Sequence, residues 1–118
     1  MSKNTYIDIE DKLDLPDSGS MTASMTIGNG QTGGHSVFLG SSLLGQGNEV
    51  TVGEVSNLHG QMLIVTCTVV DTNPNTNWTS FKVTISCDQQ ELKTFGPYSK
   101  KVDKDKDIVS YTLIIDLI

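Results

Sequence analysis

The chain of 118 residues has no long hydrophobic run and no apolar segment at its N-terminus. No stretch approaches the roughly 20 apolar residues that a transmembrane helix needs. The segment from Met1 to Tyr6 has no apolar core of the kind that directs secretion. These absences predict a protein that stays in the cytoplasm.

Charged residues are also scarce, at 19% of the chain, while hydrophobic residues make up 36%. This balance excludes a charge-rich disordered segment. The length fits one domain and leaves no room for a second. We therefore expect a single folded domain over residues 1–118.

Residues suited to acid–base or nucleophilic catalysis are few, because the chain has two histidines and two cysteines. The spacing of His35, His59 and Cys87 does not resemble a zinc site. No Ser-His-Asp or Cys-His arrangement has the spacing of a known enzyme family. The sequence therefore predicts a protein that is not an enzyme, with no catalytic residue and no cofactor.

The formal net charge is −6 and the isoelectric point is near 4.6. An acidic domain repels phosphate backbones, so nucleic acid is not an expected partner. Anionic membranes are disfavoured as well, unless Ca²⁺ bound to the protein reverses the local charge. A basic protein partner is favoured, and an acidic inhibitor or immunity-type protein that blocks a basic enzyme is one alternative function.

Apolar and polar residues alternate along several segments, which is the pattern of strands with one buried face. Residues 62–70 are apolar on both faces at first, which predicts a central strand. Residues 10–19 are expected to form a turn or an extended arm. With no amphipathic helix, the pattern predicts an antiparallel β-sandwich of about 7–8 strands, immunoglobulin-like or C2-like in outline. The expected strands lie at 21–27, 62–70, 81–87 and 109–117, with weaker ones near 5–9, 35–39, 49–52 and 92–98.

Consecutive antiparallel strands place alternate loops at the same end of a domain. Counting the expected strands puts loops 10–19, 40–48, 71–78 and 99–107 at one end. Loops 28–34, 53–60 and 88–91 would then lie at the other end.

Gly28, Gly30 and Gly33 form a G-x-G-x-x-G pattern after an expected strand. In a dinucleotide-binding fold this turn opens a helix that holds the pyrophosphate. Here the following segment, 35–39, has the pattern of a strand. We therefore interpret the three glycines as part of a hairpin turn.

Two loops carry alternating oxygen-bearing side chains that could bind Ca²⁺. The first departs from an EF-hand, because Thr76 stands at the glycine position and Lys82 at the bidentate glutamate position. Lysines interleave the second loop, which favours two solvated loops. A Ca²⁺-dependent, C2-like ligand- or membrane-binding domain is the other alternative function. The candidate ligands are Asp71, Asn73, Asn75, Asp103, Asp105 and Asp107.

If residues 71–78 closed a hairpin, Cys67 and Cys87 would lie about five residue steps apart along the strands. A disulfide needs the two Cα atoms within about 7 Å. Two buried free thiols are therefore expected.

Two apolar residues are candidates for contact with a partner. Trp78 lies in a polar loop, where it could cap the core or anchor a partner. Ile114 lies on the second face of the strand 109–117 and needs an apolar neighbour. The leading functional hypothesis is a non-enzymatic binding or assembly protein, whose partner is another copy of itself in a homo-oligomer or filament.

Overall fold

Nine strands form in the part of the chain that the structure describes, and eight of them lie where the sequence predicts a strand. The structure is a computed structural model that describes residues 3–118. Among these residues no helix is long and apolar enough to cross a membrane. The strands are β1 (Asn4–Leu13), β2 (Ser20–Ile27), β3 (Thr32–Leu39), β4 (Ser42–Gln46), β5 (Glu49–Glu54), β6 (Met62–Val70), β7 (Trp78–Cys87), β8 (Gln90–Lys101) and β9 (Ile108–Leu117), with a 3₁₀ turn at Val55–Asn57.

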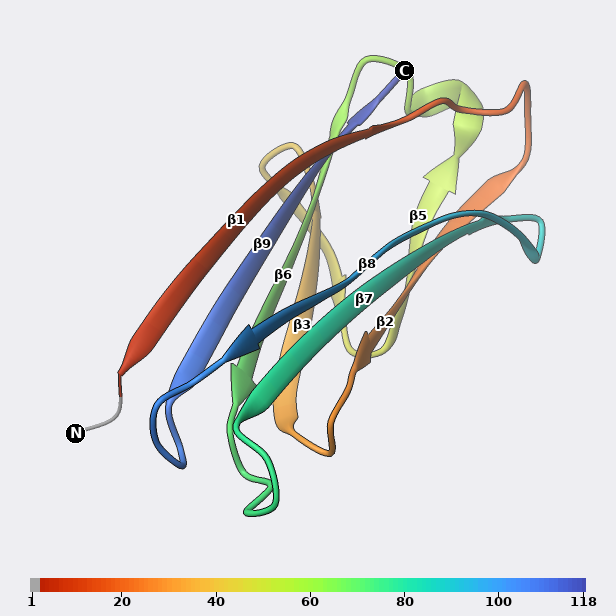
Figure 1. The fold of residues 1–118 in the computed structure, drawn as a ribbon. Coiled ribbons are helices and arrows are strands. Elements are labelled where there is room, and N and C mark those ends of the chain that lie inside the picture. The colour runs from red at the N-terminus through yellow and green to blue at the C-terminus, as the bar shows by residue number, and fades with distance from the viewer. Residues whose placement is uncertain (1–2) are drawn as a thin grey trace.

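The strands form two sheets that pack face to face, so the predicted β-sandwich is confirmed (Figure 1). One sheet has the order β1-β9-β6-β3-β4 and the other has the order β5-β2-β7-β8. The expectation of a wholly antiparallel fold is wrong at one place, because β1 pairs with β9 in parallel. β6 lies between β9 and β3, as its apolar composition predicted.

The core consists of the inward-facing residues of both sheets. Along β9 every second side chain is at most 2% exposed. Phe81 of β7 stacks between His35 of β3 and Tyr111 of β9, with ring centroids 5.9 and 5.6 Å away. The Tyr111 hydroxyl lies 2.7 Å from Thr79 Oγ1, which satisfies the buried polar end of this aromatic cluster. The buried β9 residues are Val109, Tyr111, Leu113, Ile115 and Leu117.

The strand count was too low because β4 was missed. Its residues, Ser42–Gln46, lie between glycines at 40 and 47 and do not alternate clearly, so their pattern predicts a loop. The extra strand changes which end each later loop occupies. Loops 14–19, 40–41, 55–61 and 88–89 share one end, and loops 28–31, 71–77 and 102–107 share the other (Figure 1). Loop 47–48 points the same way as the second group but stops short of that end, because β5 pairs with β2 only as far as Ser24.

Two predicted hairpins are crossovers between the sheets. The glycine-rich turn connects β2 to β3, and residues 71–77 connect β6 to β7; each pair is split between sheets. Asn29 and Gly30 have φ values of 61° and 69°, so the glycine serves a tight turn. The predicted arm at 10–19 begins later than expected, because β1 continues to Leu13.

Candidate functional site

The two ends of the sandwich carry different charges, and neither charge cluster is continuous in the sequence. The end formed by loops 14–19, 55–61 and 88–89 is here called the acidic end. Its carboxylates outnumber its lysines by six, so its formal charge equals the net charge of −6 of the whole chain. The acidic end comprises Glu10, Asp11, Asp14, Asp17, Glu54, Asp88, Glu91 and Asp116, together with Lys12 and Lys93.

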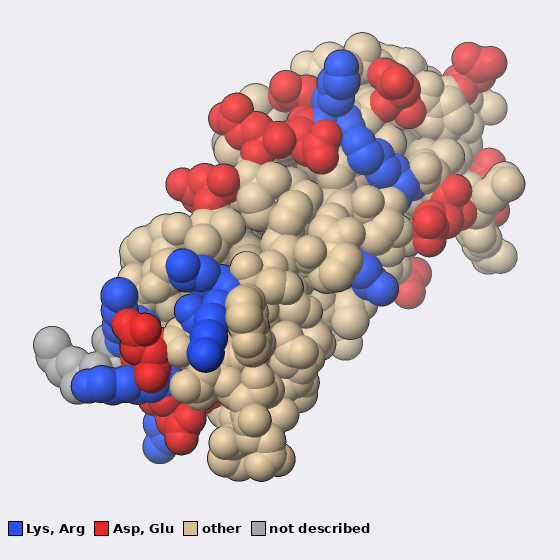
Figure 2. Space-filling view, viewed as in Figure 1, with Lys and Arg blue, Asp and Glu red and all other residues tan. Residues whose placement is uncertain are grey.

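The opposite end, formed by loops 71–77 and 102–107, is here called the lysine end. Of its four aspartates, Asp71 and Asp107 are buried and only Asp103 and Asp105 are exposed. Positive charge therefore dominates its surface, and Figure 2 shows lysines gathered at this end and carboxylates at the other. Its lysines are Lys3, Lys100, Lys101, Lys104 and Lys106.

The six candidate calcium ligands do not act as one group. Asp14 and Asp17 belong to the loop 10–19, which the count of expected strands placed at the same end as the candidate ligands. In the structure they lie at the acidic end, because the uncounted strand β4 reverses the placement of that loop relative to the later ones. Asp103 pairs with exposed Lys3 at 3.6 Å. Asn73 Oδ1 accepts a hydrogen bond from Asn75 N–H within its own turn.

Asp107 organises the main chain of its loop. Its carboxylate accepts hydrogen bonds from the backbone N–H groups of Lys3 and Lys104. The bond from Lys3 is the main reason why the pKa of Asp107 lies below its usual value. Of the candidates, only Asp71 and Asp105 remain close to a shared neighbour, Asn77.

Trp78 begins β7 at the lysine end and is 47% exposed. About half of the residue is therefore covered by the protein, and the other half is accessible to solvent or to a partner. The side chain of Gln31, 9% exposed, holds the adjoining main chain: its Nε2 donates to the carbonyls of Thr76 and Trp78. Its Oε1 accepts from Thr72 and Asn73 N–H. Trp78 therefore adjoins a loop that Gln31 holds through four hydrogen bonds.

Ile114 faces outward from the five-stranded sheet, as its place in the alternation predicted. Across the sheet it lies in register with Ile64 of β6, which in turn pairs with Phe38 of β3. Phe38 pairs with Leu43 of β4, which is 54% exposed. The four side chains form an apolar row on the outer surface, in which Leu43 is exposed and the other three are half-buried.

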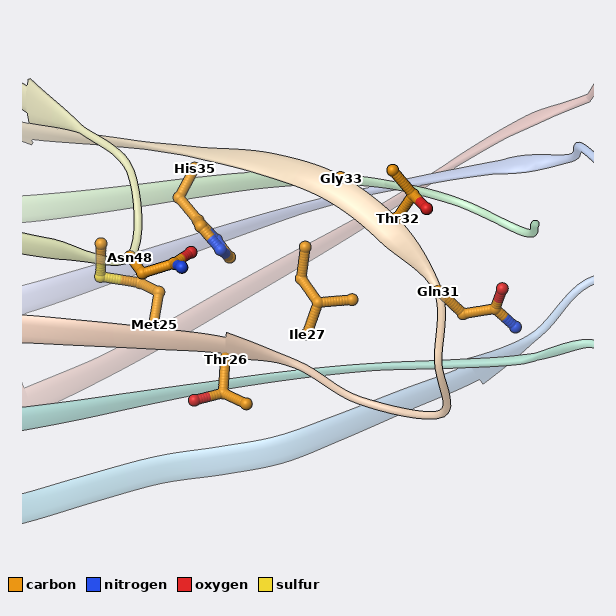
Figure 3. Close-up of a pocket in the computed structure, with 8 residues that line it drawn as sticks. All are labelled: Met25, Thr26, Ile27, Gln31, Thr32, Gly33, His35 and Asn48. Carbon is orange, nitrogen blue, oxygen red and sulfur yellow. The ribbon is translucent and has the colours of Figure 1, made fainter. Parts of the chain in front are cut away.

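An open groove of about 590 Å³ separates β2 from β3 (Figure 3). It exists because β5 pairs with β2 only as far as Ser24, and β4 pairs with β3 only from Ser36 onward. Ile27 and His35 point into the space from opposite strands. Any Cβ at Gly33 would collide with the Thr68 carbonyl, so β3 has no side chain at this point.

The histidines and cysteines do not gather as a metal site. His35 lies within β3, whereas His59 and Cys87 lie near the acidic end. Within residues 3–118, no three His, Cys, Asp or Glu side chains form a group that could hold a metal ion. Burial lowers the pKa of His35, and the amide of Asn48 opposes that shift.

Cys67 and Cys87 are both free and buried, which confirms the prediction although its reasoning was wrong. They are separated because β6 and β7 belong to different sheets, not because of a hairpin register. Burial raises the pKa of the Cys67 thiol to about 12. Burial and, secondly, the charges of Asp88 and Glu54 raise the pKa of Cys87.

Both thiols should resist alkylation at about pH 8 in the folded protein, because the reactive thiolate is scarce and access is restricted. Cys87, 7% exposed, should react before Cys67, 1% exposed. Mass spectrometry after labelling under native and denaturing conditions measures both. A native mass lower by two hydrogen atoms, mapped to this pair, would contradict the structure.

Sequence reasoning overlooked the residues that organise the lysine end. Gln31 carries no motif, and its role depends on loop 71–77 folding beside it. Asn77 was not among the candidate ligands predicted from the sequence. An available signal was the dense run of amide and hydroxyl side chains from 71 to 77, which favours turns held by side chains.

No family model, no curated protein and no solved structure matches this chain.

Proposed function

We propose that the protein is a non-enzymatic assembly protein whose copies associate end to end, with the acidic end of one copy against the lysine end of the next. The observation that carries this proposal is the segregation of charge between the two ends. Because the contact joins two different surfaces, it can repeat and generate a ring or a filament. Trp78 stands at the lysine end and supplies an exposed aromatic contact there.

The shape of the molecule favours the ends over the strand edges as contact surfaces. β4 and β5 lie against each other and close one side of the sandwich. On the other side Lys93 of β8 reaches Asp11 and the Lys12 carbonyl of β1. β8 also contains Pro97, which has no N–H to offer a partner strand.

The expected contact is weak. The Cα positions span 46 × 25 × 20 Å, so one end offers on the order of 500 Å² to a partner. Stable interfaces bury about 800 Å² on each partner. Complementary charge would therefore supply much of the attraction, and the association should be sensitive to salt.

Sedimentation velocity over a range of protein concentrations tests this proposal. We expect concentration-dependent association at about 10 mM salt and its loss at about 1 M, as the screening length falls from about 30 Å to about 3 Å. The double variant Lys100→Glu/Lys101→Glu should stay monomeric at low salt. So should Asp14→Lys/Asp17→Lys, whereas an equimolar mixture of the two variants should associate.

Three controls change the surface elsewhere. Lys82→Glu and Glu49→Lys make the same kinds of charge change between the ends and should leave association intact. Ile114→Lys disrupts the apolar row on the outer sheet face. Association that survives both end variants but is lost in Ile114→Lys would overturn the end-to-end proposal. A wild-type protein that remains monomeric at both salt concentrations would overturn self-assembly.

The concentration of carboxylates at one end also supports the second candidate function, in which the acidic end blocks a basic protein. The two functions differ in what they require. Self-assembly needs both ends, whereas inhibition needs only the acidic one. The Lys100→Glu/Lys101→Glu variant therefore abolishes the first function and preserves the second.

A further inference from the structure

Two carboxylates and one amide meet where loops 71–77 and 102–107 pack together. One terminal atom of the Asn77 amide lies 2.9 Å from Asp71 Oδ2 and 3.2 Å from Asp105 Oδ1. With its nitrogen on this side, the amide donates a hydrogen bond to each carboxylate. With its oxygen on this side, the amide places an oxygen atom within 3.2 Å of one carboxylate oxygen of each aspartate.

Asp71 has a second carboxylate oxygen that the Asn77 amide does not contact. The residue is only 1% exposed, and its Oδ1 is buried without a hydrogen-bond partner. A buried charged group with an unsatisfied oxygen is costly, so such groups are usually paired or bound to a metal. Among residues 3–118 no lysine forms an ion pair with Asp71 or Asp105.

The main chain holds these side chains in place. Asp71 N–H donates to the Asp107 carbonyl at 3.0 Å, and Lys106 N–H donates to the Asp71 carbonyl at 2.7 Å. Val102 N–H donates to the Asn77 carbonyl at 2.9 Å. Because both loops are tied together on either side of the cluster, its geometry does not depend on a ligand for support.

We propose that Asp71, Asn77 and Asp105 bind a hard divalent cation, with Asn77 turned so that its Oδ1 faces the ion. Carboxylate and amide oxygens are the ligands that Ca²⁺ and Mg²⁺ prefer, and water completes the coordination shell. The distances of 2.9 and 3.2 Å from the amide oxygen to the two carboxylate oxygens suit neighbouring ligands of one such ion. In the absence of the cation, the rotated amide bridges the two carboxylates.

The site differs from the calcium loop considered from the sequence. Its ligands come from two crossovers instead of consecutive loop positions, and Asn77 replaces Asn73 and Asn75. The protein supplies only two negative charges, and Lys104 and Lys106 flank Asp105. We therefore place its affinity among the weak calcium sites, with a Kd on the order of 1 mM.

Thermal unfolding in the presence of Ca²⁺ alone, and separately of Mg²⁺ alone, tests this site on the full chain. At about 10 mM Ca²⁺ such a site favours the folded state about 11-fold. For a domain of this size we expect Tm to rise by roughly 5 °C. A larger rise with Ca²⁺ than with Mg²⁺ would assign the site to Ca²⁺, and the reverse would assign it to Mg²⁺.

A matched pair of variants separates the site from general screening of charge. Asp105→Asn removes a ligand and Asp103→Asn removes a neighbouring exposed carboxylate, with the same change in net charge. The rise in Tm should disappear in Asp105→Asn and persist in Asp103→Asn. No rise in the wild type, or an equal rise in both variants, would overturn the proposal.

Tb³⁺ luminescence gives a readout that does not depend on stability. Trp78 directly follows Asn77, so its excitation should sensitise Tb³⁺ bound at the site. Ca²⁺ should displace Tb³⁺ and remove this emission. Asp105→Asn should lower the sensitised emission at least several-fold, and Asp103→Asn should not; equal emission from both variants would contradict the assignment.

The site lies at the lysine end, so a bound dication would add to the positive charge there. Ca²⁺ should then strengthen end-to-end association, a consequence that rests on the proposed function. The melting and luminescence experiments do not rest on it. A protein that binds Ca²⁺ but stays monomeric would contradict only the assembly proposal.

Discussion

Deletion of residues 113–118 is expected to abolish folding. The deletion removes Leu113, Ile115 and Leu117, which are 0%, 0% and 2% exposed. Burial of one aliphatic side chain contributes about 1.5–3 kcal/mol, and three together rival the total stability of a domain, about 5–15 kcal/mol. β9 also lies between β1 and β6, so both neighbours lose their partner at the acidic end.

Circular dichroism and thermal unfolding measure this effect. Two point substitutions in the same strand provide the matched comparison. Leu113→Ala should cost about 2–5 kcal/mol, because it leaves a cavity in the core. Ile114→Ala, on the outer face, should cost at most about 1 kcal/mol. A truncated chain that keeps a cooperative melt would show that the core lies elsewhere.

Replacement of Gln31 by leucine is expected to destabilise the protein by about 2–4 kcal/mol. The substitution removes one side chain but leaves four main-chain groups without partners, in Thr72, Asn73, Thr76 and Trp78. Each buried group left unpaired costs about 1–3 kcal/mol, less where water can reach it. Loop 71–77 would lose its main anchor to the β2–β3 turn, and cation binding should weaken with it.

The variant Gln31→Glu distinguishes hydrogen bonding from simple packing. Glutamate can still accept from Thr72 and Asn73 N–H, but its carboxylate cannot donate to the two carbonyls. Their repulsion and burial should raise the pKa of the new carboxyl group. A group with a raised folded pKa favours folding when protonated, so the deficit relative to the wild type should shrink from about pH 7 to about pH 4. An unchanged deficit in chemical denaturation would contradict this account.

The lysine-end loops were placed together correctly by sequence, while the acidic loop 14–19 was placed wrongly. Loops 71–77 and 102–107 are separated by β7, which alternates clearly, and by β8, which was expected as a weaker strand, so both strands were counted. Between loop 14–19 and loop 71–77 lies β4, a strand that the sequence-based count did not include. One uncounted strand reverses the end to which a loop belongs, so Asp14 and Asp17 were assigned to the wrong cluster.

The alternation of apolar and polar residues was enough to predict a β-sandwich, its inward faces and the outward position of Ile114. Burial of one face of a strand constrains every second residue, so this information is local. The strand β4 was not predicted from the sequence, because it forms by pairing with β3 and its own five residues carry no clear alternation.

Length, alternation and composition by themselves determined that this chain forms a β-sandwich with a net negative charge. The burial of one strand face depends on every second residue of a short segment, and the net charge is a sum over single residues, so neither requires knowledge of distant contacts. Only the tertiary structure decided that β1 runs parallel to β9, that the charges separate into two ends, and that Asn77 meets Asp71 and Asp105. These features join residues up to about a hundred positions apart. Such contacts depend on the order of strands in the sheets, which no local pattern encodes.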